Sequence, residues 1–344
     1  MTASTTPTIS AEAQQRIVDL LAKELGVASP QVSAAVTLLD GGATVPFIAR
    51  YRKEATNNLD DTHLRTLEER LLYLRELEER RQTILASIEE QGKLTDELRR
   101  AIEQAATKQA VEDIYLPFKP KRRTKAQIVR EAGLEPLADA LLADPTLDPE
   151  QEAVKYVKVV AAAEGVEAIN VPDAKAALEG ARDILVERFA ETADLLALLR
   201  TKLWNEGIVT STVLPGKETA EEEKFRDYYA YSETIRTIPS HRALAMFRGR
   251  TLGVLKLDLG LGETLDAQVP HPCAALIAAH FGIENKGRRA DKWLSDVCYW
   301  AWRVKVHLHL STELLLQVRE AAEAEAIKIF GRNLHELLLA APAG

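Results

Sequence analysis

Apolar residues between Leu59 and Gln91 recur at intervals of three, four and, in one place, seven residues. This spacing puts them along one side of a single helix. They are Leu64, Leu67, Leu71, Leu74, Leu77, Ile84 and Ile88. Asp60 suits the N-cap position, and Gly92 suits a left-handed residue after the last turn. About 30 residues with a rise of roughly 1.5 Å each give a rod of about 45 Å. The pattern therefore predicts one long amphipathic helix, whose charged opposite face we expect to be solvated.

Shorter helical patterns precede this rod. Ser10 and Gly26 bound a first helix, and Ser29–Pro30 supplies an N-cap followed by proline for a second. The pair Gly41–Gly42 breaks the second helix, and a third begins at Val45. A helix, a tight glycine turn and a second helix form the outline of helix-turn-helix and helix-hairpin-helix motifs. Any helical hairpin needs such a turn, so the pattern alone leaves a role in nucleic-acid contact open.

Helical patterns resume after the rod and continue to Gly207. Thr124 suits the N-cap of a helix that ends at Gly133. Near the other end of the chain, Ser311 suits the N-cap of a helix over Leu314–Ile329.

Two short stretches have the residue pattern of β-strands. Residues 208–214 are rich in β-branched side chains, and residues 251–259 alternate leucine with other residues. Phe225–Tyr231, between them, is aromatic and helical in tendency. We therefore predict a mainly α fold. It is a multi-helix elongated scaffold with a long central helix, helix-turn-helix-like elements and a small two-stranded β element near 208–214 and 251–259. The change from helical to strand-like residue patterns divides the chain into two domains, 1–206 and 207–344.

Composition places the chain among cytosolic proteins. Its 344 residues are 46% hydrophobic and 28% charged, which is ordinary for a globular protein. The N-terminus has no secretory signal pattern, and no apolar run approaches the ~20 residues of a membrane span. With only two cysteines there is no disulfide framework. We expect a cytoplasmic protein that does not associate with membranes.

Catalytic and metal-binding patterns are absent from the sequence. No serine or cysteine lies in a nucleophile motif, and the acidic residues are spread along helix faces. The spacing of the histidines and cysteines in the second half of the chain matches no zinc pattern. They are His271, Cys273, His280, Cys298, His307 and His309. We expect no cofactor and no enzymatic activity.

The segment Lys119–Lys125 is the most informative local sequence. Five of its seven residues are basic, and the prolines nearby keep it extended. Positive charge beside the helix that begins after Thr124 is a plausible phosphate site. The alternative is that these cations dock onto acidic residues of the helical rod. The sequence does not decide between the two.

Two further basic clusters stand out against a net charge of −8. One follows the glycine turn, and the other precedes Trp293, a combination of cations and an aromatic ring that single-strand binders use. A buried tryptophan beside a basic loop is equally common. The candidate nucleic-acid-binding residues are Arg50, Arg52, Lys53, Lys119, Lys121, Arg122, Arg123, Lys125, Lys286, Arg288, Arg289 and Lys292.

Several stretches resemble signatures of the Tex family of bacterial transcription accessory proteins. They are Val45–Glu54, Leu116–Lys125, Lys224–Tyr228, and Ile238–Ala245 with Phe247–Gly249. The resemblance covers nearly the whole chain from about Ile9. It implies a Tex-like N-terminal helical domain over 1–206 and a Tex-like central region over 207–344.

Members of this family are long multidomain proteins. The resemblance implies that a ribonuclease-H-like domain, helix-hairpin-helix modules and an RNA-binding barrel would follow residue 344. On this interpretation the chain is an N-terminal part of such a protein, and any catalysis would belong to the ribonuclease-H-like domain.

Two functions remain open. The first is a helical scaffold of a transcription accessory factor that makes weak, non-sequence-specific contacts with RNA or DNA backbones through the basic clusters. The second is a protein-interaction module that docks RNA polymerase or another transcription factor without binding nucleic acid. The sequence does not decide between RNA and DNA.

Overall fold

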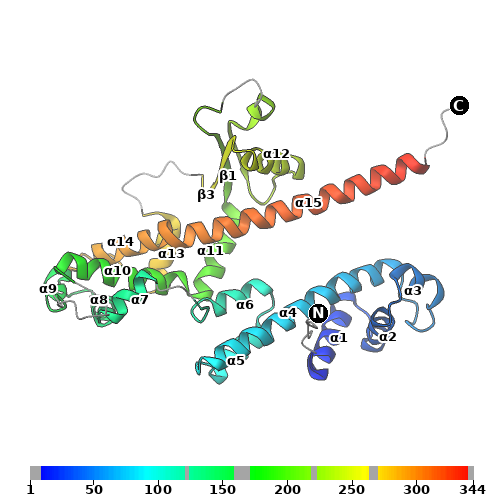
Figure 1. Cartoon of the computed structure of the whole chain (residues 1–344), viewed down its shortest axis with the longest axis horizontal. Coiled ribbons are helices and arrows are strands. Elements are labelled where there is room, and N and C mark those ends of the chain that lie inside the picture. Colours follow the sequence, from blue (N-terminus) through cyan, green and yellow to red (C-terminus); the bar gives the residue numbers. More distant parts are fainter. Residues whose placement is uncertain (1–8, 121–123, 159–170, 218–222, 263–269, 340–344) are drawn as a thin grey trace, which may run out of the picture. The chain divides into compact units, whose positions relative to one another are not determined.

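The structure, a computed structural model, describes residues 9–120, 124–158, 171–217, 223–262 and 270–339 (Figure 1). The chain divides into two compact units, Met1–Lys119 and Pro120–Gly344. We call them unit 1 and unit 2. The first strand begins at Ile208, where the residue pattern changes from helical to strand-like. The predicted domain boundary at 206/207 stays a prediction.

Helices are the only regular elements among the described residues of unit 1. Its helices are α1 (Ala11–Leu25), α2 (Ser29–Asp40), α3 (Val45–Tyr51), α4 (Asp61–Glu90), α5 (Asp96–Gln104) and α6 (Lys108–Tyr115). Figure 1 shows α1 and α2 packed along α4. The chain turns sharply after α4, at Gly92, whose φ of 66° is the left-handed conformation expected of it.

The long helix predicted from the apolar stripe is α4. The Asp60 carboxylate accepts a hydrogen bond from the His63 backbone N–H at 2.8 Å, which confirms the N-cap. Every residue of the predicted stripe is buried, and Leu59 and Leu64 are buried at the start of the helix. The stripe forms one core with side chains of the neighbouring helices, among them Leu21 and Ile102.

The charged face of α4 is less solvated than we expected. Its arginines bind carboxylates on the helices packed around it or, in the case of Arg81, on α4 itself. The pairs are Arg70 with Glu24 at 2.7 Å, Arg75 with Asp40 at 2.7 Å, Arg80 with Glu112 at 2.5 Å and Arg81 with Glu78 at 3.0 Å. The hydrogen bonds from Arg75 hold the pKa of Asp40 below its ordinary value. These arginines stabilise unit 1 and have little charge left to offer a ligand.

Unit 2 contains helices and a small sheet. Its helices are α7 (Lys125–Glu131), α8 (Glu135–Ala143), α9 (Pro149–Val154), α10 (Ala174–Ala190), α11 (Ala193–Glu206), α12 (Ser240–Thr251), α13 (Pro272–His280), α14 (Asp291–Ala301) and α15 (His307–Leu339). Its strands are β1 (Ile208–Val213), β2 (Ala230–Thr234) and β3 (Leu255–Gly260). A 3-10 helix covers Glu223–Tyr228, and a π-helical segment covers Trp302–Val306.

Helix α10 lies at the centre of the helical part of unit 2, where α7, α8, α9 and α14 pack against it. Its core side chains are fully buried, and the ring of Phe189 stacks on Phe281 with centroids 4.1 Å apart. Gly180 allows a close approach, because a Cβ there would lie 2.4 Å from Leu134 Cδ1.

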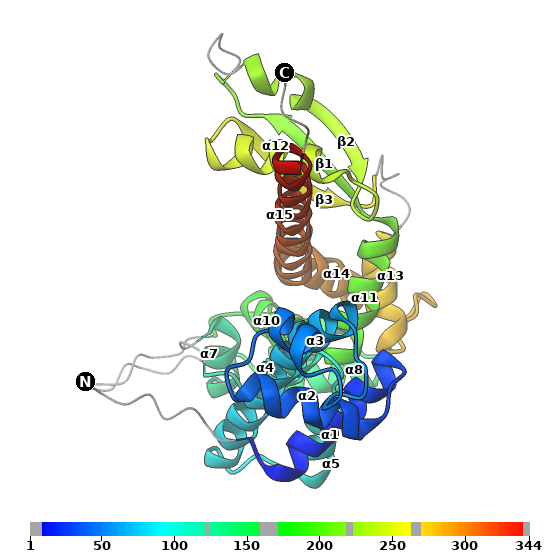
Figure 2. The ribbon, with the colours of Figure 1, turned by 90° about the vertical axis from the view of Figure 1, so that its right-hand side faces the viewer.

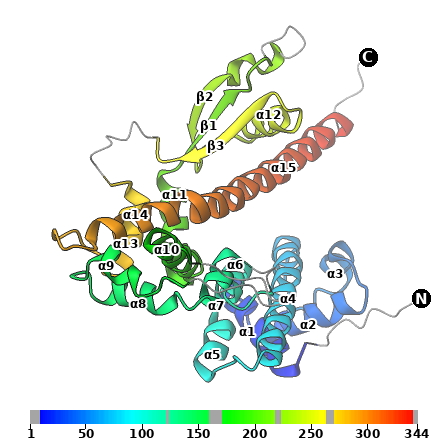
Figure 3. The same cartoon turned by 60° about the vertical axis from the view of Figure 1, so that its left-hand side comes forward.

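The sheet has three strands rather than the two predicted. The order is β2-β1-β3 and both pairs are antiparallel, as Figure 3 shows. The segment expected to be helical is helical only as far as Tyr228, and β2 begins at Ala230. The second predicted strand is displaced, because Thr251 ends α12 and β3 begins at Leu255. The mainly α fold class is confirmed.

Helix α15 begins earlier than predicted and is longer. It follows α14 and the π-helical segment, and Ser311 lies inside the helix instead of capping it. The Ser311 hydroxyl donates to the His307 carbonyl at 2.5 Å, four residues back. Figure 2, which views α15 nearly end-on, shows α12 to the left of it and the strands to its right. Among the helices that the structure describes, none is both long and apolar enough to cross a membrane.

Candidate nucleic-acid interface

The turn between α2 and α3 sets the direction of α3. Gly42 has a φ of 84°, which glycine adopts without strain, and the Ala43 N–H donates to the Leu38 carbonyl at 3.0 Å. Helix α3 then buries Val45 and Ile48, which are 3% and 0% exposed. The two buried residues are three apart, so they fix one face of this short helix against unit 1.

The opposite face of α3 carries two exposed aromatic rings and a cation. These residues are Phe47, Arg50 and Tyr51. Arg50 lies three positions after Phe47 and Tyr51 lies four positions after it, so all three are on the same side of a helix. Phe47 is 43% exposed and Tyr51 is 61% exposed. Their ring centroids lie 5.4 Å apart with the planes inclined by 48°. Exposed rings on a helix surface offer platforms on which nucleic-acid bases stack.

A compact turn after α3 holds two more cations in place. Thr56 is fully buried, and its hydroxyl donates to the carbonyls of Arg52 at 3.4 Å and Lys53 at 3.3 Å. Asn57 and Asn58 adopt left-handed backbone conformations, with φ of 47° and 65°. The Asn58 N–H closes the turn on the Lys53 carbonyl at 2.8 Å.

Gln31 of α2 braces the same turn. Its side-chain amide donates to the carbonyls of Thr56 at 3.3 Å and Asn57 at 2.9 Å. The backbone that carries Arg52 and Lys53 is therefore fixed from outside as well as from within.

The cations of this region have no internal partner that the structure describes. Arg50, Arg52 and Lys53 are exposed, and none of them forms an ion pair with a described residue. In this respect they differ from the arginines of α4. We call Phe47, Arg50, Tyr51, Arg52 and Lys53 the α3 patch. Sequence reasoning selected its three cations but did not single out its two rings.

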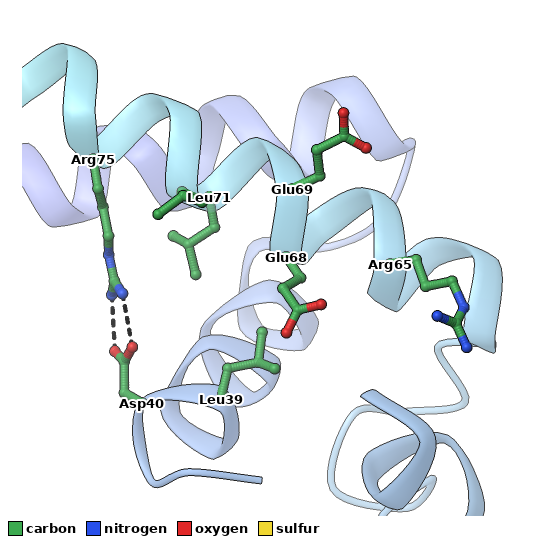
Figure 4. Close-up of a pocket in the computed structure, with 8 residues that line it drawn as sticks. Leu39, Asp40, Arg65, Glu68, Glu69, Leu71 and Arg75 are labelled. Atoms are coloured by element: carbon green, nitrogen blue, oxygen red, sulfur yellow. Dashed lines mark hydrogen bonds and ion pairs between the residues drawn. The ribbon is translucent and has the colours of Figure 1, made fainter. Parts of the chain in front are cut away.

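A hollow beside the end of α2 has the wrong charge for an anion. Figure 4 shows Arg75 of α4 bound to Asp40, with Glu68 and Glu69 in the same lining. Arg65, also in the lining, pairs with Asp61 at 2.6 Å. Glu68 and Glu69 form no ion pair with a described residue, although Arg65 and Arg70 lie near them. The hollow is therefore acidic, although it lies close to the glycine turn.

The second predicted cluster falls partly outside the described residues, which do not include Lys121, Arg122 and Arg123. Lys119 and Lys125 are exposed, and neither pairs with a carboxylate that the structure describes.

Thr124, in the same segment, has the predicted role of N-cap. Its hydroxyl accepts from the Gln127 N–H at 3.1 Å and donates to the Glu187 carboxylate at 3.1 Å. Glu187 is only 3% exposed and also binds Arg130 at 2.5 Å. A buried carboxylate therefore already lies at the start of α7. A phosphate-binding role for Lys119–Lys125 stays a prediction.

The third predicted cluster is largely engaged within unit 2. Arg288 donates to Asp291, a carboxylate that is 1% exposed, at 2.9 Å. The backbone N–H groups of Lys286 and Arg288 donate to the same carboxylate at 2.7 and 2.8 Å. Lys286 pairs with Glu284, and Arg289 lies 3.8 Å from Asp148. Lys292 alone in this cluster is exposed and without an ion pair to a described residue.

Burial acts to raise the pKa of Asp291. The hydrogen bonds from the Arg288 side chain and from the two backbone N–H groups outweigh it, so the pKa lies below its ordinary value. The loop before α14 is folded around this ionised carboxylate. Trp293, directly after it, is half-buried.

The structure describes no metal centre. Its described residues contain no group of three or more histidine, cysteine or acidic side chains that could hold an ion. Both cysteines are buried, and burial raises the pKa of the Cys298 thiol to about 12.

Comparison with known families matches both parts of the chain. Residues 15–89 match the Tex-like protein N-terminal domain, and residues 144–330 match the Tex central region-like family. This chain belongs to the Tex family. The resemblance seen in the sequence is thereby confirmed. The α3 patch lies within the matched N-terminal domain, and Lys286–Lys292 lies within the matched central region.

Relatives of this Tex-family chain are longer than it is. "Protein tex" of Bordetella pertussis is 55% identical over 100% of this chain and 43% of its own length. "Transcriptional accessory protein Tex" of Neisseria gonorrhoeae is 53% identical over 95% of this chain and 42% of its own length. A more distant relative, "S1 RNA-binding domain-containing protein 1" of Pongo abelii, is 28% identical over 95% of this chain and 32% of its own length. The chain therefore spans about two-fifths of the bacterial relatives.

Proposed function

We propose that this Tex-family chain is a non-catalytic, nucleic-acid-associated part of a transcription accessory factor. It contacts single-stranded RNA or DNA through the α3 patch. Arg50, Arg52 and Lys53 bind backbone phosphates, and Phe47 and Tyr51 stack on bases. Such contacts position the chain on the strand without reading its sequence.

The observation that carries the proposal is the coincidence of free charge and exposed rings. The three cations meet no carboxylate among the described residues, whereas Arg288 and the arginines of α4 do. A cation that already has a carboxylate partner gains little from binding a phosphate. The buried turn at Thr56 holds Arg52 and Lys53 on a fixed backbone, so less conformational entropy is lost on binding.

The names of the relatives support the general setting. One is called a transcriptional accessory protein, and another carries an RNA-binding domain in its name. An alternative proposal is that unit 1 docks RNA polymerase or another transcription protein. The experiment below separates the two.

The test is a fluorescence anisotropy titration of labelled oligouridylate, oligodeoxythymidylate and duplex DNA at low salt. The chain is compared with the triple variant Arg50→Ala, Arg52→Ala, Lys53→Ala. Each lost phosphate contact lowers the slope of log affinity against log salt by roughly 0.7 for single strands, so three contacts account for about 2. We expect the variant to bind single strands at least tenfold more weakly and with a slope lower by about 2.

The matched control removes the same charge from other parts of unit 1. Lys23, Lys93 and Arg100 are exposed and form no ion pair with a described residue. The triple alanine variant of these residues should bind almost as well as the unaltered chain. Equal losses for the two variants would mean that only total charge matters. No binding of any oligonucleotide at micromolar protein would leave protein docking as the better proposal.

The rings are tested separately from the charge. Tyr51→Leu keeps an apolar side chain but removes the stacking surface, which is worth about 1–3 kcal/mol per stacked base. We expect weaker binding of single strands with an unchanged salt slope, measured in the same titration. Leu72→Ala, at a leucine that is 62% exposed on α4, is the control and should have no effect.

A further inference from the structure

The outer edge of β3 is open along part of its length. In the described sheet β3 pairs with β1 on one side only. Leu214 N–H donates to the Val254 carbonyl at 2.9 Å, and the register continues from this pair with Thr212 opposite Lys256. Backbone groups alternate in direction along an antiparallel pair. The peptide groups of Leu255, Leu257 and Leu259 therefore point away from β1.

One end of this edge is closed, and the rest is not. The Leu259 N–H donates to the Asp258 carboxylate at 3.0 Å, and the Leu259 carbonyl lies 2.6 Å from His307 Nε2. The outward N–H and C=O groups of Leu255 and Leu257 have no hydrogen-bond partner in the described part of the chain. Unpaired groups in a row at a sheet edge form a template for another strand.

A groove runs beside this open edge. It lies between β3 and the helix formed by the π-helical segment and the start of α15, with a volume of about 540 Å³. Figure 3 shows β3 as the strand nearest to α15. Val304 and Leu308, which line the groove from the helix, are 45% and 66% exposed. π-Helical turns occur preferentially at functional sites.

The charge of the groove is positive. Arg250, Lys256 and Arg303 line it, are exposed, and form no ion pair with a described residue. Asp258 is the carboxylate in the lining, and it is occupied by the Leu259 N–H. The groove therefore combines open backbone groups, an apolar floor and a surplus of positive charge.

We propose that this groove binds an extended acidic peptide, which adds to β3 as a fourth strand. Backbone groups of the peptide pair with Leu255 and Leu257, and an apolar side chain packs on Val304 and Leu308. Acidic side chains meet Arg250, Lys256 and Arg303. The open backbone ladder favours a peptide over a nucleic acid, because main-chain pairing at a sheet edge is the usual source of affinity in strand addition. This site is in unit 2 and does not depend on the α3 patch.

The probe is a labelled nine-residue peptide of alternating glutamate and valine with blocked ends, titrated against the whole chain by fluorescence anisotropy. We expect saturable binding. A peptide with lysine in place of glutamate should not bind. A peptide N-methylated at alternate residues, on the edge that faces β3, should bind at least tenfold more weakly. An N-methylated peptide that binds equally well would overturn strand addition.

Two matched variants test the place of binding. Leu308→Glu puts a negative charge in the groove and should weaken peptide binding at least tenfold. Leu316→Glu makes the same change at an exposed leucine of α15 outside the groove, which is 51% exposed, and should have no effect. Circular dichroism checks that both variants remain folded. Equal effects of the two variants, or the absence of saturable peptide binding, would overturn the proposal.

Amide hydrogen exchange gives an independent readout. On peptide binding, the amides of Leu255 and Leu257 should become protected. The amide of Lys256 already pairs with β1 and should change little. Protection of these amides by oligouridylate, with displacement of the peptide, would assign the groove to nucleic acid and overturn the peptide. The triple alanine variant at Arg50, Arg52 and Lys53 should bind the peptide normally. Either proposal, the peptide groove or the α3 patch, can therefore be overturned without the other.

Discussion

At the scale of single residues, arginines in this chain differ in the carboxylates that they meet. Arg75 binds Asp40 with two nitrogen atoms at 2.7 and 2.8 Å, and Arg288 binds the buried Asp291. Arg50 has no such partner among the described residues. The sequence located the basic clusters, because clusters are local. It could not locate the partners, since Arg75 and Asp40 are 35 residues apart along the chain.

Most helix N-caps, in contrast to the ion-pair partners, could be predicted from the sequence. Ser10, Asp60 and Thr124 cap helices as predicted, because an N-cap binds a backbone N–H only a few residues away. The prediction for Ser29 was wrong by one residue, since Ser29 is the first residue of α2 and Ala28 is its N-cap. The exposed face formed by the rings of Phe47 and Tyr51 was only partly predictable. Their spacing predicts a shared face, but apolar residues occupy both faces of α3. The sequence could not tell which face would be buried.

Removal of Arg288 should destabilise unit 2. Arg288→Ala leaves the Asp291 carboxylate buried with only its backbone donors, at a cost of about 2–3 kcal/mol. Lys292→Ala, in the same cluster but exposed, should change stability by less than about 0.5 kcal/mol. Urea unfolding followed by circular dichroism measures both. Similar effects for the two variants would show that Arg288 has no special structural role.

Acid should weaken the contact between His271 and Trp302. The Trp302 indole N–H donates to His271 Nε2 at 3.1 Å. Burial, and then the charge of His307, lowers the pKa of His271 below its ordinary value. The unfolded chain therefore binds a proton more readily than the folded chain. The stability contributed by His271 is fully present above about pH 6.5 and is lost as the pH falls through its lower folded-state pKa.

The measurement for His271 is thermal unfolding at pH 7.5 and 5.5. The unaltered chain should lose more stability over this interval than His271→Gln, which cannot be protonated there. Histidines that do not interact with His271 contribute equally to both proteins and cancel in the comparison. An identical loss in both proteins would show that protonation of His271 is not linked to folding.

At the scale of elements, long periodic helices were predictable and the sheet was only partly so. Helix α4 needs only its own apolar period, whereas β2 exists because it pairs with β1, with Tyr231 opposite Ser211. That partner is distant in sequence, and the aromatic residues around Tyr231 do not specify it. Ser311 was predicted as a cap because the pattern does not distinguish a serine at a helix start from one bonded inside a helix.

Gly249 should be essential to the packing of α12 on β3. A Cβ at this position would lie 2.5 Å from Leu255 Cδ1 and 2.8 Å from its Cγ. Gly249→Ala should therefore destabilise the chain by about 1–3 kcal/mol, although alanine favours a helix. The control is Gly331→Ala in α15, where a Cβ would meet no atom within 4 Å. Differential scanning fluorimetry should give a lower Tm for the first variant and an unchanged or slightly higher Tm for the second.

At the scale of the whole molecule, the chain consists of two compact units, each with its own buried core. Unit 1 is built around α4, and unit 2 around α10. The three predicted basic clusters are distributed over both units. The sequence could not assign them to units, because compactness depends on contacts between distant residues and not on local texture.

Two compact units should unfold separately on heating. Leu67→Ala creates a cavity in unit 1 and Phe189→Ala creates one in unit 2, each at a cost of about 2–5 kcal/mol. We expect scanning calorimetry to resolve two transitions, with each variant lowering only one of them. A single transition that both variants lower would mean that the units fold as one.

The π-helical segment Trp302–Val306 acts as a one-residue phase shift in an otherwise regular helix. Upstream, α14 presents Leu294 and Val297 to its neighbours, and downstream α15 presents Leu310 and Leu314. The wide π turn absorbs one extra residue, so a strictly regular α-helix through the same residues would turn everything downstream by about 100° relative to α14. One helix then could not pack on α10 at one end and on α12 at the other. The wide turn therefore lets a single continuous helix contact two differently oriented neighbours.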